Sequence, residues 1–247
     1  MSQPGNDLPP RRWEIDCARG AAVGLMIVSN FLFDLVFFGG KEQLQSSVLD
    51  WFARFVAGFF IVLAGISLTL SQARPDSRFY GFGKIVFRGL GLMGLGLVVT
   101  GATWFAAGDG MVIFGVLHLI GAGLILVYPF VGHPMVSLVA GVLISSAALW
   151  TNEVRLDTSW LLWLGLQPYD FSSVDYAPLI PWLGPMLIGV FLGHMLYPDG
   201  NRRYRIADLS QRWPVRVLTW GGRHSLVIYF VHQPVLLAGL FLALKWR

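Results

Sequence analysis

Four polar side chains lie inside long apolar stretches of this sequence, and they are the residues that could do chemistry. Asn30 and Asp34 fall in the first stretch at a spacing of i, i+4, so a helix would place both on one face. His118 falls in the fourth stretch and His232 in the seventh. A carboxylate or an imidazole at bilayer depth is expensive unless it is paired or hydrated, so all four are candidates for acid–base or hydrogen-bonding chemistry.

Each candidate also has a structural interpretation. The Asn30 amide and the imidazoles of His118 and His232 could simply hydrogen-bond a neighbouring helix. The Asp34 carboxylate is harder to explain in this way. Counting residues from the ends of the stretches puts Asn30 near mid-membrane, Asp34 in the outer half and His118 about 10 Å below the outer surface, with His232 deeper, in the inner half. We therefore expect Asn30, Asp34 and His118 to line one water-accessible cavity that opens outward.

Apolar segments long enough to cross a bilayer would have to position these residues. The chain has 247 residues, of which 55% are hydrophobic and only 13% are charged, whereas a soluble domain would carry roughly a quarter charged residues. The mean hydropathy is +0.62. This composition predicts an all-α, multi-pass transmembrane bundle of about seven spans, near 20–38, 52–71, 86–106, 111–131, 134–150, 179–197 and 225–244. We expect one domain over residues 11–247, preceded by a disordered tail at residues 1–10.

The distribution of Lys and Arg predicts the orientation of these spans. Of the 18 basic residues, 13 fall in segments that would be cytosolic if the N-terminus is inside. The other five are Lys41, Arg54, Arg155, Lys245 and Arg247. This asymmetry favours a cell-membrane protein with a cytosolic N-terminus and an external C-terminus. It also accounts for the net charge of +4, so nothing in the composition points to nucleic acid. The single Cys17 excludes an internal disulfide and offers no metal framework.

Two polar segments interrupt the spans. Residues 151–178, expected outside, are acidic and aromatic, and residues 198–224, expected inside, are rich in Arg. Those arginines could serve topology and anionic lipid alone, or they could bind an anionic cytosolic ligand. Glycines at 20, 65, 89 and 121 could likewise line a thin-walled passage or could simply let helices pack closely.

Several short motifs, in order along almost the whole chain, together resemble the catalytic-domain family of heparan-α-glucosaminide N-acetyltransferase. They are Arg12-x-x-x-Asp16-x-x-Arg19-Gly20, Phe31-x-Phe33-Asp34-Leu35, Ala64-Gly65-Ile66-Ser67-Leu68, Phe114-Gly115-x-Leu117-His118-x-Ile120-Gly121, Asp175-Tyr176 with Pro181-Trp182, and Gly222-Arg223-His224-Ser225 with His232-Gln233-Pro234. The resemblance implies a multi-span acyltransferase that moves an acetyl group from cytosolic acetyl-CoA to a sugar or glycolipid acceptor on the far side of the membrane.

The resemblance also suggests roles for the candidate residues. His118 would be the general base, Asp34 would orient it and Asn30 would polarise the thioester. The lysosomal enzyme of the family has a catalytic His in the loop after the first span, but here Gly39–Trp51 contains none. The catalytic base is therefore either His118 by default or absent. The residues expected to bind acyl-CoA or substrate are Arg19, Arg88, Arg216, Arg223, Asp175, Tyr176, Trp182 and His232.

Two other classes of function stay open at this point. One is a non-catalytic membrane protein that binds lipid or polysaccharide or supports a partner enzyme. The other is a small-solute transporter, which is disfavoured because the sequence has no internal repeat of the kind that secondary transporters use. The acceptor, the acyl chain and the oligomeric state do not follow from the sequence.

Overall fold

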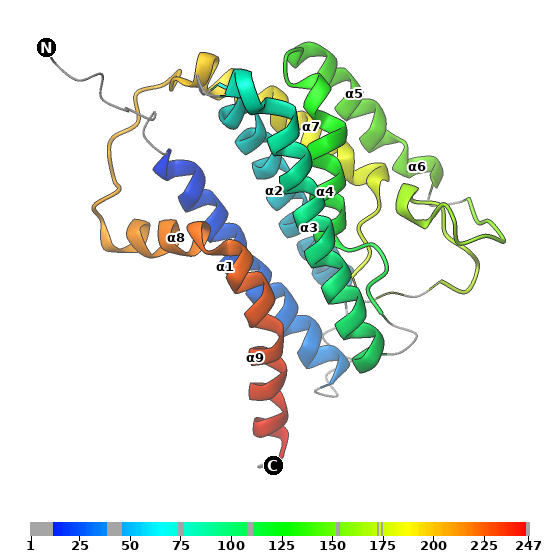
Figure 1. The fold of residues 1–247 in the computed structure, drawn as a ribbon. Coiled ribbons are helices and arrows are strands. Elements are labelled where there is room, and N and C mark those ends of the chain that lie inside the picture. Colours follow the sequence, from blue (N-terminus) through cyan, green and yellow to red (C-terminus); the bar gives the residue numbers. More distant parts are fainter. Residues whose placement is uncertain are drawn as a thin grey trace, which may run out of the picture. The chain divides into compact units, whose positions relative to one another are not determined.

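The chain folds into helices, as a computed structural model shows for residues 12–38, 46–73, 77–107, 111–151, 154–171, 173 and 175–245 (Figure 1). The elements are α1 (Trp13–Phe37), α2 (Ser47–Gln72), α3 (Ser77–Ala107), α4 (Val116–Val127) with a 3-10 turn η3 (Tyr128–Phe130), α5 (Pro134–Ser146), α6 (Ala148–Thr151), η4 (Leu162–Leu164), α7 (Leu179–Leu196), η5 (Pro198–Gly200), α8 (Trp213–Arg223) and α9 (Ser225–Lys245). The predicted all-α fold is confirmed. The tail predicted at residues 1–10 lies outside the described residues.

The apolar helices account for all seven predicted spans. Among the described residues, five helices are long and apolar enough to cross a membrane, namely α1, α2, α3, α7 and α9. The other two, α4 with η3 and α5, are shorter apolar helices. Many large apolar side chains on these helices are exposed, including Phe87 and Phe105 on α3. Lipid would cover such surfaces, and the chain is therefore a multi-pass membrane protein.

The helices form two compact units. The first unit comprises Met1–Phe60 and Ile206–Arg247, and the second comprises Ile61–Arg205. Helix α2 contributes its first half to the first unit and its second half to the other. Each unit is described by itself below, and the single domain predicted over residues 11–247 stays a prediction.

In the first unit, α1 packs against α8 and α9. Figure 1 shows α8 lying across α1 and the chain bending sharply from α8 into α9. The crossing of α1 and α8 depends on Gly20 and Gly222. A methyl group on Gly20 would overlap the carbonyl oxygen of Leu218, and one on Gly222 would overlap that of Asp16. The two backbones are therefore in direct contact.

The second unit has a contiguous apolar core formed by α3, α4, α7 and the second half of α2. Its buried members are Ile61, Leu68, Ile85, Leu119, Leu124, Val127, Val131, Ala177, Leu179, Met186, Leu187 and Val190. Gly89 and Gly121 face each other where α3 meets α4, since a Cβ on either would lie 2.6 Å from the other's carbonyl oxygen. Gly65 meets α7 in the same way. Close helix packing thus accounts for all four glycines that could have lined a passage.

The fourth span differs from the prediction at its start. Residues 111–115 are not helical, and α4 begins at Val116. The segment is held by the loop before α7, because the Ser173 hydroxyl donates to the Met111 carbonyl at 2.9 Å and the Ala177 N–H donates to the Phe114 carbonyl at 2.8 Å. These bonds come from residues far along the chain, and they place His118 in the first turn of α4.

Candidate functional site

Two pairs of polar side chains join α1 and α9 in the first unit. The Asn30 amide nitrogen lies 2.7 Å from Nε2 of His232, and the Gln233 amide donates to Oδ1 of Asp34 at 2.8 Å. An i, i+4 pair on α1 thus meets two consecutive residues of α9. We call these four residues the α1–α9 polar cluster. Sequence reasoning missed Gln233, although a carboxamide within an apolar span is subject to the same cost argument as Asn30.

The hydrogen bonds of His232 assign its tautomer. Its Nδ1 lies 2.7 Å from the carbonyl oxygen of Tyr229 and 3.2 Å from that of Ile228. Carbonyl oxygens only accept, so Nδ1 carries the proton and Nε2 accepts from Asn30. Both nitrogens of the His232 ring are therefore engaged in hydrogen bonds. The bond also corrects the predicted depth, because His232 lies beside Asn30 and not below it.

The reason for this depth lies in the order of the helices. Helix α8 crosses α1 at Gly20, and only His224 lies between the end of α8 and the start of α9. The start of α9 is consequently already past the crossing. Counting from the first residue of each apolar stretch treated Gly20 and Ser225 as lying at the same level.

The α1–α9 polar cluster contains two buried acceptors that are not satisfied within the described residues. Asp34 is 1% exposed, and its second oxygen Oδ2 has no hydrogen-bond partner there. The carbonyl oxygen of the Gln233 side chain is also buried without a partner. Leaving such groups unpaired costs on the order of 1–3 kcal/mol each, more for a charge. A group that carries protons, such as water, an amine or a hydroxyl, would satisfy both.

His118 is the corresponding buried group of the second unit. Its imidazole is 4% exposed and stacks on the ring of Phe114, with the ring centroids 5.5 Å apart. The ring also lies against the backbone of α3, where a Cβ on Gly96 would come within 2.7 Å of it. Neither ring nitrogen has a hydrogen-bond partner among the described residues. A buried imidazole with both nitrogens unpaired needs an explanation, and a bound water or ligand, or a catalytic role, would supply it.

Asp175 positions the helix that carries His118. Its Oδ2 accepts from the Val116 N–H at 3.3 Å, which satisfies a donor at the open N-terminus of α4. The preceding residue is Gly115, where a Cβ would lie 2.5 Å from the same oxygen. Asp175 thus holds the backbone at Val116, two residues before His118. A contact between Asp175 and the substrate stays a prediction.

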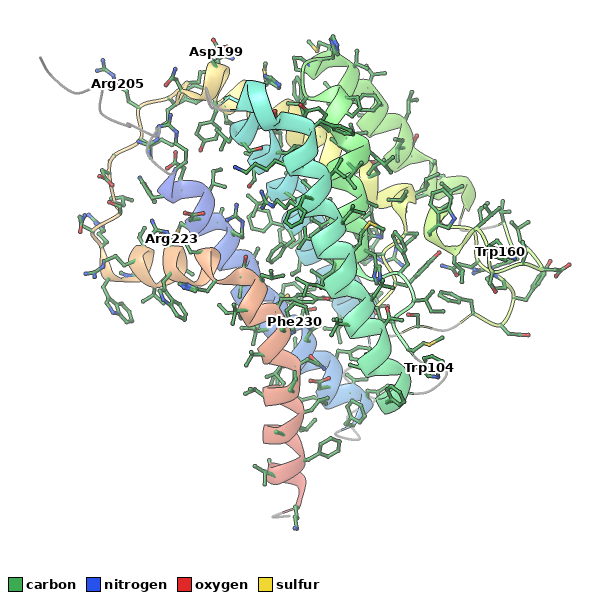
Figure 2. All side chains as sticks on the ribbon, in the orientation of Figure 1. Trp104, Trp160, Asp199, Arg205, Arg223 and Phe230 are labelled. Atoms are coloured by element: carbon green, nitrogen blue, oxygen red, sulfur yellow. The ribbon has the colours of Figure 1, made fainter. Side chains whose placement is uncertain are left out.

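The other residues predicted to bind substrate in the second unit also have structural partners. The Tyr176 hydroxyl donates to the Leu162 carbonyl at 2.7 Å, and burial raises the pKa of this phenol, outweighing a hydrogen bond from Gln167 and the charge of Arg155. Trp182 packs against the apolar core. Trp160, by contrast, is exposed in the loop that extends from α6 (Figure 2).

The four arginines predicted to bind CoA are distributed over both units. In the first unit, Arg19 and Arg223 both bind the carboxylate of Asp16, at 3.1 and 3.4 Å. Two guanidinium groups thus share one carboxylate where α1 crosses α8. Arg216 is exposed on α8 in the same unit, and Arg88 is exposed on α3 in the second unit. The binding of CoA by these arginines stays a prediction.

The second unit also contains a cavity of about 440 Å³ at the C-terminal ends of α2, η3 and α7. None of the predicted site residues lines it; its walls include Gln72, Tyr128, His194 and Asp199. Within the described residues, no three His, Cys, Asp or Glu side chains are grouped closely enough to hold a metal ion. Asn30, Asp34 and His232 are brought together in the first unit, whereas His118 belongs to the second. The common cavity expected for Asn30, Asp34 and His118 stays a prediction.

Comparison with known proteins decides the family. The model of the family described as heparan-alpha-glucosaminide N-acetyltransferase, catalytic, matches residues 11–234, which is nearly the whole chain. The chain belongs to this family. No curated protein and no solved structure matches the chain. The resemblance inferred from the short motifs is confirmed, and membership of the heparan-alpha-glucosaminide N-acetyltransferase family indicates a membrane acetyltransferase-like role.

Proposed function

We propose that the protein is an integral membrane acyltransferase that moves an acetyl or other acyl group from cytosolic acyl-CoA to a glycan acceptor at the outer face. The observation that carries the proposal is the family match over residues 11–234. The buried polar groups of both units support it, because they provide an imidazole, a carboxylate and a carboxamide inside apolar helices. Such groups can act as a general base and can polarise a carbonyl.

In the proposed reaction, an amine or hydroxyl of the acceptor attacks the thioester carbonyl. The C–N or C–O bond forms, the C–S bond breaks, and CoA leaves as a thiol. We assign His118 as the general base that takes the proton of the attacking group and passes it to the departing sulfur. The lack of a partner for either ring nitrogen among the described residues supports this role, since the nitrogen that carries the lone pair can accept the proton without giving up a hydrogen bond.

The two other assigned residues belong to the α1–α9 polar cluster. Asn30 is proposed to polarise the thioester carbonyl, for which it has one amide hydrogen besides the one donated to His232. Asp34 is proposed to bind a proton-bearing group through Oδ2, the oxygen that Gln233 leaves unoccupied. Arg19 and Arg223 are proposed to meet the CoA phosphates, supported by the position of both guanidinium groups at Asp16, where α1 crosses α8.

The test uses the full chain in nanodiscs. We expect it to bind acetyl-CoA and to hydrolyse it slowly without an acceptor. His118→Ala should keep the binding and lose the hydrolysis, whereas the matched control His133→Ala, an exposed imidazole before α5, should keep both. Neutral substitution of Arg19 or Arg223 should weaken binding and make it less sensitive to salt. Full hydrolysis by His118→Ala would remove the assigned base. A wild-type protein that neither binds nor hydrolyses acetyl-CoA would favour the non-catalytic alternative.

A further inference from the structure

Helix α8 has apolar groups on two opposite faces. One face packs on α1 and buries Thr219 and Gly222. The opposite face carries Trp213, Val217 and Trp220 at positions i, i+4 and i+7, and these side chains are 75%, 49% and 60% exposed. We call these three residues the α8 stripe. A short helix with two indoles open to water would present an apolar patch that requires a partner.

Positive charge borders the α8 stripe. Arg212 lies at the N-cap position of α8 and is exposed, and Arg216 is exposed one turn further on. The helix from Trp213 to Arg223 contains no acidic residue. Two indoles beside guanidinium groups are the combination found where proteins meet the headgroup region of a membrane, because the rings and the aliphatic stems are apolar and their polar tips reach water and phosphate.

The position of α8 in the first unit matches that environment. It contacts α1 at Asp16 and Gly20, where the polar beginning of α1 changes into its apolar stretch. The chain then bends directly into α9 (Figure 1). Helices α1 and α9 are both candidate membrane spans. Helix α8 thus lies at the level where both of them would enter the bilayer, and it runs across α1.

We propose that α8 is an interfacial helix that binds the bilayer surface. The α8 stripe would lie at the boundary between headgroups and acyl chains, and Arg212 and Arg216 would bind the phosphates of anionic lipids. The inference goes beyond the proposed acyl transfer and needs no acyl-CoA, so its failure would leave the transfer proposal untouched. With the predicted orientation, the surface concerned is the cytosolic one.

The first experiment measures depth in the full chain in nanodiscs. In a Cys17→Ser background, Val217→Cys carries a polarity-sensitive fluorophore, and Gln211→Cys, exposed two residues before α8, is the matched control. We expect nitroxide lipids with the label near the glycerol to quench the fluorophore at position 217, and aqueous iodide to quench the one at position 211. Equal access of iodide to both positions would overturn the proposal, because the stripe would then face water or a soluble partner.

The second experiment tests whether Arg212 and Arg216 bind anionic lipids. Energy transfer from position 217 to labelled phosphatidylglycerol, compared with labelled phosphatidylcholine, reports enrichment of the anionic lipid. We expect Arg212→Gln and Arg216→Gln to reduce that enrichment by about fivefold each. Arg205→Gln, in the loop before α8 (Figure 2), is the matched control and should change it little. Unchanged enrichment in the two variants, or its loss on addition of inorganic phosphate at constant ionic strength, would show that the arginines do not select lipid phosphates.

Discussion

The side chains of Asn30 and His232 are joined by a 2.7 Å hydrogen bond although 202 residues separate them in the chain. Together with the bond between Asp34 and Gln233, it fixes how α9 is rotated on α1. Lipid tails are as apolar as the helix surfaces, so burial of apolar area does little to choose one helix face over another in a membrane. Hydrogen bonds and close packing make that choice instead.

The first prediction is that Asn30 and His232 are energetically coupled. We expect Asn30→Leu and His232→Leu each to destabilise the protein, and the double variant to be less destabilised than the sum, with a coupling of about 1 kcal/mol. Unfolding in mixed micelles would measure the cycle. A control cycle of Asn30→Leu with Val231→Leu, an exposed neighbour of His232, should be additive. Additivity in the Asn30–His232 cycle would show that the bond does not hold the helices.

The second prediction concerns the space beside His118. Gly96→Ala would place a methyl group 2.7 Å from the imidazole, so the ring must rotate. We expect a loss of about 1–3 kcal/mol of stability and a loss of acetyl-CoA hydrolysis. Gly94→Ala on the same helix meets nothing within 4 Å and should be neutral or slightly stabilising. The prediction is wrong if the two variants unfold and hydrolyse alike.

The third prediction tests the crossing of α1 and α8. Gly20→Ala would push a methyl group into the Leu218 carbonyl, so α8 must move away and the Asp16–Arg223 pair must open. We expect a loss of about 1–3 kcal/mol in thermal unfolding. Gly24→Ala, one turn further along α1, has open space around it and should keep the stability of the wild type. Equal melting temperatures for the two variants would contradict the backbone contact.

The fourth prediction concerns orientation, which the asymmetry of the basic residues favours. In a Cys17→Ser background, single cysteines at Ser2 and Lys245 can be treated on intact cells with a thiol reagent that does not cross membranes. We expect labelling at position 245 and none at position 2. Labelling before and after permeabilisation provides the control, since both positions should react once the membrane is open. The reverse pattern on intact cells would overturn the topology.

The fifth prediction is a pH dependence at Tyr176. Burial raises the pKa of this phenol above its ordinary value of about 10, so the folded protein retains a proton that the unfolded chain releases. The stabilisation is complete below pH 10 and is lost as the pH rises from there through the folded pKa. Thermal unfolding should show Tyr176→Phe about 1 kcal/mol less stable at neutral pH, with the difference closing above pH 10. A difference independent of pH would contradict the assignment.

The sequence was sufficient for the class of fold because membrane spans are marked by local properties. Apolar length alone identified all seven helical segments. Their ends depend on distant residues. The start of α4 was misplaced because its N-terminal cap is Asp175, from a loop beyond two further helices. No periodicity within residues 111–131 contains that information.

In the candidate site, too, local features could be predicted from the sequence and distant partners could not. A spacing of i, i+4 correctly placed Asn30 and Asp34 on one face of α1, and the cost of a buried carboxylate singled out Asp34. The partners could not be predicted, because the residues that bind them come from the other end of the chain. The same holds for Asp16: its bond to Arg19 follows from the spacing i, i+3, whereas its bond to Arg223 spans 207 residues. Sequence reasoning also cannot separate a carboxylate that caps a helix, such as Asp175, from one that faces solvent.

The cap at Asp175 has a mechanical consequence. The segment that supplies it is also bonded to Met111 and Phe114, so three attachments link the loop before α7 to residues 111–116, which lead into the first turn of α4. A ligand that displaced this loop would remove the cap from Val116 and loosen the turn in which His118 lies. We therefore expect displacement of this loop to alter the alignment of the imidazole. A ligand that binds at Asp175 or Ala177 would in this way act on His118.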